Sequence, residues 1–437
     1  MRNSVNRRDF LKGAAAAGVG YWVANQYARG EEGSSPSDKL NVGIVGVTGR
    51  GGANIKEMET EAGKLINISA LCDVDDIFLS KAGTDFPKAQ KYNDYRKMLE
   101  QKDLDAVLVA TADHAHAWIT LAALRSGRHV YCEKPLAHSV QEIRVVTETA
   151  MREKRVTQMG TQIHSQDNYR RVVELIQSGA IGPVSAVHIF IDKAWYQDKP
   201  AREGVPVPAN LHWDLWQCAT PERAYSPDYL PFIWRKWWAY GEGTLGDMGC
   251  HFFDLPKWAL QLGAPTKIRA EGPEVHPEWC PKWLTVDYEF PARGDQPPVH
   301  LTWSDAGKRP AAVQDLNEPK WKNGVLFVGE KGQLLADYGK YKVFPEEKFK
   351  DFEPPKPTIP ASLGHHKEWV VACMKNEPTA PLCNFSYSGP LAEAVLLGTV
   401  AYRAGEELTW DATKLAATNS ARAEEFIKLQ YRKGWTL

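Results

Sequence analysis

Three polar residues in the second half of the chain have the spacing of one helical face. The segment 245–262 is predicted to be a helix, and Asp247, His251 and Asp254 stand at i, i+4 and i+7 within it, so their side chains should share one side. Two carboxylates a turn away can hold an imidazole in one tautomer and raise its pKa. We therefore predict His251 as a general base or acid on a reacting hydroxyl. Asp247 would orient the substrate or the imidazole. Asp254 would contact these two side chains and help to hold them in position.

The same three residues could instead bind a metal ion, because imidazole and carboxylate groups are common metal ligands. No further cluster of Cys and His residues supports this alternative. The seven cysteines are scattered, their number is odd and no C-x-x-C occurs. Neither a zinc framework nor a disulfide scaffold is indicated, and we predict no metal site.

A fourth candidate, Lys134, follows the short apolar run 129–132, which is predicted to be a strand. At the carboxyl end of a parallel strand, Lys134 would reach the crevice where such sheets bind ligands. Oxidising a secondary alcohol requires a hydride acceptor and a base, and Lys134 would hydrogen-bond the reacting oxygen and relay its proton. A lone lysine after a strand is usually solvated, and a lone Asp/His face is usually surface. The hypothesis therefore depends on Lys134 and the face of Asp247 and His251 occurring in the same chain.

The hydride acceptor is predicted from a glycine-rich turn, GVTGRGG at 46–52, between the apolar run 40–45 and a helical pattern. Such a turn directs backbone N–H groups and a helix N-terminus at a pyrophosphate. Gly46 and Gly51 fit the first and third positions of G-x-G-x-x-G, while Thr48 takes the second. A G-x-x-G-x-x-G pattern starting at the same glycine is the alternative. Since Thr48 would crowd the closest approach, we expect the phosphate nearer Gly49 and Arg50.

Asp73 ends the second apolar run, 65–73, where an acid commonly accepts hydrogen bonds from the adenosine ribose. A carboxylate there repels a 2′-phosphate, so we predict NAD as the cofactor. Asp75 is a second candidate for this role. Arg50 could accommodate a 2′-phosphate, so NADP stays possible.

The first part of the chain alternates apolar strands and helices, with a third strand at 105–110 and a helix at 118–126. This alternation predicts a Rossmann-type, doubly wound parallel sheet over residues 37–160. Ligands bind beyond the carboxyl ends of its strands. Further cofactor contacts are accordingly predicted for Thr111, His114, Glu133, Lys134 itself and Gln162.

The second part, 161–437, has strands of period near two at 184–192, 283–290, 299–303 and 324–335. This pattern predicts an α+β domain with an open, mainly antiparallel sheet. Between its first two strands lies a segment rich in Trp and Tyr, residues 195–238, which we call the aromatic insert. It either walls a substrate cleft or braces the fold. The predicted substrate contacts are His164, Trp195, Trp213, Trp234, Arg235 and Asp254.

The first 36 residues are predicted to be an export signal and linker. NRRDFLK at 6–12 precedes an Ala/Gly-rich apolar stretch and resembles the twin-arginine signal, with Asn6 where Ser or Thr is more usual. A helix of the folded protein is disfavoured because residues 14–20 show no polar face. We expect the twin-arginine export machinery as a partner and a periplasmic or exported location. The route carries folded proteins, which would explain an exported chain without a disulfide pattern.

Composition excludes two classes of partner. The formal net charge of −1 gives no electrostatic reason to bind nucleic acid or an anionic membrane. No apolar run reaches the roughly 18–20 residues that span a bilayer. We expect neither a nucleic-acid partner nor a membrane span.

These motifs together resemble the Gfo/Idh/MocA family, the relatives of glucose-fructose oxidoreductase and inositol dehydrogenase. The matching segments are the glycine turn, Asp73, ATADHAH at 110–116, Glu133-Lys134-Pro135 and GDMGCHFFD at 246–254. The tryptophan-rich middle and the stretch 384–411 resemble the exported bacterial branch. The resemblance covers nearly everything from residue 39 onward. It implies the roles given above to Lys134, Asp247 and His251, and an open sheet that often mediates oligomerisation.

The leading hypothesis is an NAD-dependent oxidoreductase acting on a secondary hydroxyl or keto carbon of a sugar or polyol. The first alternative is redox-neutral cleavage of a glycoside through a transient keto-sugar. The resemblance includes related exported proteins that are NAD-dependent glycosidases of this kind. The second is a non-catalytic sugar- or nucleotide-binding protein. Because an exported enzyme has little free NAD available, we expect a tightly bound cofactor. We also expect a homo-oligomer.

Overall fold

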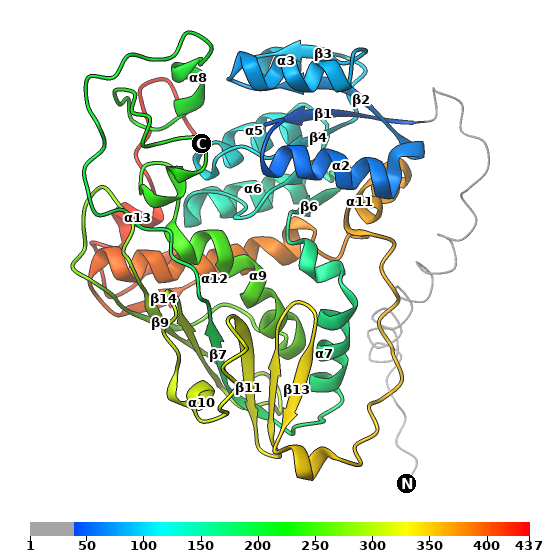
Figure 1. Ribbon diagram of the computed structural model, residues 1–437, viewed down its shortest axis with the longest axis vertical. Helices are drawn as coiled ribbons and strands as arrows, with labels where there is room; N and C mark the ends of the chain where they lie inside the picture. Colours follow the sequence, from blue (N-terminus) through cyan, green and yellow to red (C-terminus); the bar gives the residue numbers. More distant parts are fainter. Residues whose placement is uncertain (1–38) are drawn as a thin grey trace.

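The computed structural model describes residues 39–437, so the predicted export signal lies outside the described residues. Within that range the chain forms two sheets with helices packed between and around them (Figure 1). No helix in it combines the length and the apolar character that a membrane crossing requires.

The first sheet is parallel and six-stranded, in the order β3-β2-β1-β4-β5-β6. Its central strands are wholly or almost wholly buried apolar runs, as expected where helices cover both faces. The strands are β1 (Leu40–Val45), β2 (Ile66–Cys72), β3 (Gln90–Tyr92), β4 (Ala106–Val109), β5 (His129–Cys132) and β6 (Thr157–Met159). The helices between them are α2 (Arg50–Ala62), α3 (Asp76–Asp85), α4 (Tyr95–Met98), α5 (Asp113–Arg125) and α6 (Val140–Glu153), with a 3₁₀ turn η2 (Gly63–Leu65).

The second sheet has nine strands in the order β13-β12-β11-β7-β10-β9-β8-β14-β15. Only the pair β7–β10 is parallel, and the other pairs are antiparallel. The strands are β7 (Val184–Phe190), β8 (Lys267–Glu271), β9 (Thr285–Phe290), β10 (Val299–Ser304), β11 (Gly324–Gly329), β12 (Gln333–Ala336), β13 (Tyr341–Phe344), β14 (Leu408–Asp411) and β15 (Ala416–Ala417). The predicted fold class is therefore confirmed, and the predicted run 324–335 is a hairpin of β11 and β12.

Helices join the two sheets. Figure 1 shows α9 (Gly243–Leu260) and α12 (Phe385–Ala404) across the middle of the molecule, between the first sheet above and the second sheet below. α9 packs on β7 and β11, and α12 packs on both α9 and α6. One continuous hydrophobic core consequently includes residues of both sheets.

The remaining elements are short or peripheral. They are η3 (Gln162–Ser165), α7 (Asp167–Gln177), α8 (Trp213–Gln217), η4 (Ile233–Lys236), α10 (Ala311–Gln314), η5 (Glu346–Phe349), α11 (His365–Lys375) and α13 (Glu424–Ile427). α11 returns from the second half of the chain to α2, where Trp369 joins the core beside the first sheet. The aromatic insert is mostly irregular and reaches up to the first sheet (Figure 1).

Candidate active site and glycine-turn cavity

The turn after β1 needs glycine at two positions. A Cβ on Gly51 would lie 1.9 Å from the carbonyl oxygen of Gly46, and a Cβ on Gly46 would lie 2.5 Å from the carbonyl oxygen of Ala110. Gly46 also has a φ of +85°, and Gly49 a φ of +57°. These constraints fit the pattern in which Gly46 and Gly51 are the first and third glycines. The N-terminus of α2 then begins at Arg50, with exposed Thr48 on the turn.

Asp73 lies beside this turn. Its Oδ2 accepts a hydrogen bond from the backbone N–H of Val47 at 3.0 Å, and its Oδ1 accepts from that of Asp75 at 3.0 Å. Burial raises the pKa of Asp73 despite these bonds. Asp75 has a different task, because its side chain caps α3 and accepts a hydrogen bond from Asn210.

A cavity of about 350 Å³ opens beside the turn, and we call it the glycine-turn cavity. Its floor is made by the carboxyl ends of β1, β2 and β4, where a doubly wound sheet binds its ligand. Tyr95 and Arg96 form one side. The aromatic insert contributes Trp216, Phe232 and Trp234, and the C-terminal segment contributes Arg432 and Trp435. In Figure 1 the C-terminus accordingly lies close to α5 and the insert.

Several predicted cofactor residues line this cavity: Gly46, Thr48, Gly49, Arg50, Asp73, Thr111 and His114. The Nε2 of His114 lies 2.7 Å from the carbonyl oxygen of Trp216. Burial lowers the pKa of His114 to about 4, so its ring is neutral at pH 7. A neutral ring beside a carbonyl carries its proton on Nε2.

Arg50 and Glu133 differ from their predicted roles. The guanidinium of Arg50 donates to the carboxylates of Glu133 and Glu57 at 2.9–3.0 Å. Glu133 also accepts from Asn54 and is buried, outside the lining of the glycine-turn cavity. Arg50 is therefore occupied by two carboxylates, and the prediction that it could accommodate a 2′-phosphate is not supported by this arrangement.

The centre of the site is the buried carboxylate of Asp247, in the second turn of α9. Its Oδ1 is 2.9 Å from Lys134 Nζ and 3.1 Å from Arg235 Nε. Its Oδ2 is 3.1 Å from Lys193 Nζ and accepts a 2.6 Å hydrogen bond from the indole N–H of Trp195. Lys134 also donates to the backbone carbonyl of Asp247. The predicted convergence of Lys134 with the α9 face is thus present in the structure.

Three cations on one carboxylate decide its ionisation. Burial alone would raise the pKa of Asp247, but Lys134, Arg235 and Lys193 together hold it well below the usual range. Arg235 also lines the glycine-turn cavity, so it connects this ion cluster to that cavity. The guanidinium stacks over the ring of Trp234, 4.1 Å from its centroid.

His251 follows Asp247 by one helical turn and is buried. Its Nδ1 has no hydrogen-bond partner among the described residues. Contrary to the prediction of a raised pKa, burial and then the charge of Lys134 lower the pKa of His251 well below its ordinary value, while Asp247 opposes the shift. The imidazole is therefore neutral and already able to accept a proton.

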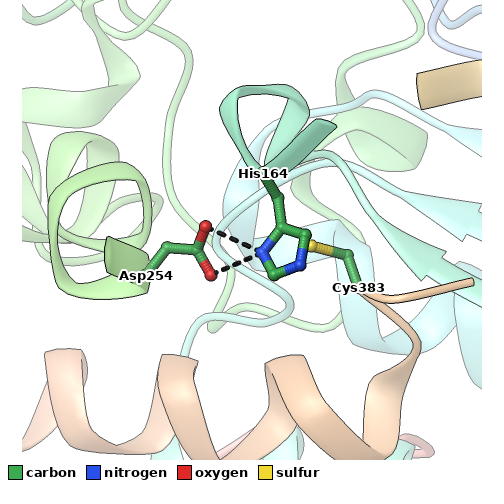
Figure 2. Close-up of side chains that lie close together, drawn as sticks. All are labelled: His164, Asp254 and Cys383. Carbon is green, nitrogen blue, oxygen red and sulfur yellow. Dashed lines mark hydrogen bonds and ion pairs between the residues drawn. The ribbon is translucent and has the colours of Figure 1, made fainter. Parts of the chain in front are cut away.

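Asp254 does not support His251. Both of its carboxylate oxygens lie 2.9–3.0 Å from Nδ1 of His164, with Cys383 on the far side of that ring, as Figure 2 shows. Tyr387 donates a 2.7 Å hydrogen bond to the same carboxylate, and His164 stacks on Trp258. His164 and Asp254 are fully buried in the core and line none of the described cavities. This placement gives no support to their predicted contact with the substrate, because α9 carries Asp254 away from Asp247.

The remaining predicted substrate residues divide into two groups. Trp195 and Arg235 contact Asp247, and Trp234 lines the glycine-turn cavity. Trp213 instead lies inside the aromatic insert, stacked on Trp216, with its indole N–H bonded to the carbonyl of Arg223. One part of the aromatic insert thus contacts the candidate site, and another part packs on itself and braces the fold.

Two features of the site escaped the sequence analysis. Lys193 contacts Asp247, and its only sequence signal is that it follows a strand, as Lys134 does. Arg432 and Trp435 close the glycine-turn cavity from the end of the chain, and no local pattern indicates this. Gln162, predicted as a cofactor contact, lies in η3 with a buried Oε1 that has no partner among residues 39–437, and it is not part of the lining of the glycine-turn cavity.

Comparison with known proteins agrees with this geometry. Residues 40–161 match the NAD-binding Rossmann fold of the Gfo/Idh/MocA oxidoreductase family, and residues 167–297 match the C-terminal α/β domain of the same family. The chain belongs to the Gfo/Idh/MocA family. Residues 4–20 match the twin-arginine translocation signal, so the protein is exported to the periplasm or beyond.

Curated relatives match over part of their length. Inositol 2-dehydrogenase of Salmonella typhimurium is 32% identical over 155 residues, which are 34% of this chain and 45% of that protein. A glycosyl hydrolase family 109 protein of Shewanella baltica is 30% identical over 209 residues, 41% of this chain and 44% of that protein. Each match thus spans less than half of the relative.

Solved structures share the fold over most of this Gfo/Idh/MocA chain. GenD2 from gentamicin A biosynthesis, in complex with NAD, has a TM-score of 0.60 at 19% identity and covers 88% of this chain and 99% of its own. The WlbA dehydrogenase of Bordetella pertussis, in complex with NADH and UDP-GlcNAcA, has a TM-score of 0.60 at 17% identity, with 85% and 99% covered. At these identities the likeness shows the fold.

Replacing Asp247 by Asn should destabilise the protein, because three cations lose their shared anion. We expect the free energy of unfolding to fall by about 3 kcal/mol, the lower end for a buried pair, since Lys193 is partly exposed. A carboxyl with a depressed native pKa stabilises the fold above its unfolded value near ~3.9, and this stability is lost as pH falls through the native value. The difference between wild type and Asp247→Asn should thus be constant from about pH 5 to 8 and shrink below about pH 4.

Chemical denaturation at several pH values measures this difference. Glu100→Gln serves as the control, because Glu100 and its partner Lys97 are both exposed, and such a pair contributes about 0–1 kcal/mol. A loss for Asp247→Asn no larger than that of the control would contradict the role given to the ion cluster.

Proposed function

We propose that this protein is an NAD-dependent oxidoreductase that transfers a hydride between nicotinamide and a secondary hydroxyl or keto carbon of a sugar or polyol. The observation that carries the proposal is the contact of Lys134 with Asp247, one turn from the neutral imidazole of His251. Arg235 joins this group to the glycine-turn cavity. We further propose that residues 37–160 act as the cofactor domain and residues 161–437 as the substrate and oligomerisation domain.

The residues present fit a dinucleotide. The close backbone contacts at Gly46 and Gly51 make the turn tight and set the start of α2 beside the glycine-turn cavity, where a pyrophosphate would bind, and Asp73 lies beside the turn to accept from ribose hydroxyls. Gln162 and His251 have buried polar atoms without partners. When bound, the nicotinamide supplies the hydride acceptor or donor. We favour NAD over NADP because Asp73 would repel a 2′-phosphate and Arg50 is engaged elsewhere.

Asp247 remains ionised at any working pH, since its pKa lies well below the usual range. Two N–H groups of Lys134 donate to the side chain and the backbone carbonyl of Asp247, so the ammonium is held in place while its third N–H donates to the reacting oxygen. Lys193 and Arg235 limit the free motion of the carboxylate by binding both of its oxygens. The cluster orients Lys134 before substrate arrives.

His251 accepts the hydroxyl proton in the oxidative direction. Because it is neutral at rest, no prior deprotonation is needed. The nearby carboxylate of Asp247 stabilises the imidazolium once it forms, whereas Lys134 disfavours it. Opposing charges of this kind keep the proton mobile, as the reverse reaction requires.

A second function is favoured by the similarity to glycosyl hydrolase family 109 proteins. In redox-neutral glycoside cleavage, a ring hydroxyl is oxidised, elimination breaks the glycosidic bond, and the hydride returns. The same lysine, aspartate and histidine would serve. A non-catalytic binding role is less well supported, because a neutral imidazole one turn from the Lys134–Asp247 contact is an arrangement suited to proton transfer.

Cofactor retention is a further part of the proposal. The aromatic insert and the C-terminal segment both line the glycine-turn cavity, so their contacts would slow the release of a bound dinucleotide. The export signal also supports retention. Little free NAD is available to an exported enzyme, so the protein would have to carry its cofactor across the membrane.

We also propose a homo-oligomer, with the face of the second sheet turned away from α9 and α12 as the contact surface.

Replacing the proton-handling residues should lower turnover and spare nucleotide binding. For His251→Asn and for Lys134→Met we expect a loss of about 10²–10⁴ in kcat, the usual effect of removing a positioned acid or base. Steady-state rates with the best substrate measure this loss. His300→Asn and Lys97→Met are matched controls. The side chains of His300 and Lys97 are partly or fully exposed, and both residues are far from Asp247 along the chain and pair with other carboxylates. Unchanged turnover in either site variant would remove that residue from the mechanism.

A panel of sugars, polyols and glycosides should separate the two catalytic functions. Net oxidation produces NADH in step with a keto product, so absorbance and product mass rise together. In redox-neutral cleavage the free sugar accumulates while the nucleotide returns to its starting form each cycle. If no compound in the panel gives NADH or a new product mass, both enzymatic functions are contradicted.

The folded protein should contain nucleotide after purification. Denaturing it and analysing the supernatant by mass spectrometry should give close to one dinucleotide per chain, with NAD rather than NADP as the main species. Phe232→Ala, at the roof of the glycine-turn cavity, should lower this occupancy, whereas Met374→Ala, on the exposed side of α11, should not. An empty wild-type protein that also binds NAD weakly would contradict retention.

A further inference from the structure

A second cavity of about 350 Å³ lies at the junction of α5, the start of α6, the end of α12 and the C-terminal segment. Neither Lys134 nor Asp247 lines it, so it is separate from the reaction site. His114 of α5 lines both this cavity and the glycine-turn cavity. We call it the second cavity. Its volume is that of sites that hold small metabolites.

Arg403, near the end of α12, is a cation in this cavity without a counter-ion in contact. It makes no hydrogen bond or ion pair with any residue in 39–437, although the buried Glu242 lies close enough to raise its pKa against the effect of burial. Its guanidinium carbon is 4.9 Å from the ring centroid of Trp238 and 4.3 Å from that of Phe426. Ring faces attract the cation without accepting its N–H hydrogen bonds in the way a carboxylate does.

The other cations of the second cavity are neutralised. Arg223 pairs with Glu278 at 3.1 Å, and Lys428 pairs with Glu424. Of the three lining cations in the described chain, Arg403 alone therefore lacks an anion in contact. A partly buried guanidinium with unused donors is costly to maintain, which points to an anion that is supplied from outside.

Two buried groups beside this cavity already have neighbours within the protein. The carboxylate of Glu142 accepts from the hydroxyl of Tyr431 and from the backbone N–H of His138. The ring of His138 is buried and neutral at pH 7, and its enclosed Nε2 lies 3.5 Å from Glu242 Oε1. Neither group therefore competes with Arg403 for an occupant of the cavity.

The walls are aromatic. Trp118 of α5, Trp238, Phe426 and Tyr431 all line the second cavity. Flat aromatic faces favour the C–H surface of a polyhydroxylated carbon chain or ring over a compact inorganic anion. The combination is thus one guanidinium without an anion in contact and several ring faces.

We propose that the second cavity binds a small hydroxylated organic acid, with its carboxylate on Arg403 and its carbon skeleton against the aromatic walls. Carboxylates pair with guanidinium through two parallel hydrogen bonds, and no acceptor among residues 39–437 occupies the donors of Arg403. The site is additional to the proposed catalytic function, and its occupancy can be measured whether or not the protein turns over a sugar.

Calorimetric titration of the purified full-length protein with D-gluconate tests the proposal. We expect Arg403→Gln to weaken gluconate binding by about 10- to 100-fold, the usual effect of losing a charge-assisted bidentate contact. Arg403→Lys, which keeps the charge but not the planar fork, should weaken it by a smaller factor. Arg269→Gln, an exposed arginine on β8, is the matched control and should bind as wild type does.

Two further arms separate this site from the reaction site. Lys134→Met should bind gluconate with wild-type affinity, because Lys134 does not line the second cavity. The uncharged D-glucitol should show at least about tenfold weaker binding that is insensitive to Arg403→Gln.

The proposal is overturned by any of four results: no gluconate binding to wild type, equal affinity in Arg403→Gln, loss of binding in Lys134→Met, or equal affinity for D-glucitol. Should Arg403→Gln fail to fold, the comparison of Arg403→Lys with wild type decides, and equal affinity there overturns it.

Discussion

The site depends on one buried anion. The carboxylate of Asp247 is out of water, and such a charge is tolerated only when cations and hydrogen bonds replace its hydration. Each partner comes from a different part of the chain: Lys134 from the end of β5, Lys193 from the end of β7, and Arg235 from the aromatic insert. α9 carries the carboxylate itself. The ion cluster therefore fixes the relative position of both sheets and the insert at the place where catalysis is proposed.

The state of His251 follows from the same cluster. A histidine beside a carboxylate is usually easier to protonate, yet here burial and Lys134 have the larger effect. The cations around Asp247, Lys134 above all, add positive potential at the imidazole that opposes the effect of the carboxylate. A neutral base is the outcome. The Asp247–His251 pair alone would raise the pKa of His251, whereas burial and the full set of neighbouring charges lower it.

How much could be predicted from the sequence depended on whether a feature is local. The glycine turn, the apolar strands and the helix of Asp247 are local patterns, and the structure has them within a few residues of the predicted bounds. The face formed by Asp247, His251 and Asp254 was also predicted, but a shared face is not a shared site. Seven residues of helix advance about 10 Å, which carries Asp254 out of the cluster and into the core, where η3 brings His164 to meet it.

Features built from distant segments had no such signal. Lys193 is an ordinary lysine until β7 places it next to Asp247, and nothing near Trp435 indicates that it reaches the cavity beside Gly49. The same holds for α11, whose Trp369 completes the core under the first sheet from the far end of the chain. Contacts of this kind between distant segments can be recognised only once the fold is known.

Export places a further demand on the fold, and the cysteines show how it is met. All seven are buried and unpaired, so an exported protein of this family has free thiols in a compartment that favours disulfides. Burial raises the pKa of these thiols, to about 12 for Cys218 and for Cys250, and the thiolate is the form that oxidises. A chain that crosses the membrane already folded keeps its thiols enclosed throughout. The tight core that joins the two sheets thus protects the thiols as well as holding Asp247 in position, which ties the stability of the exported protein to the packing that builds its site.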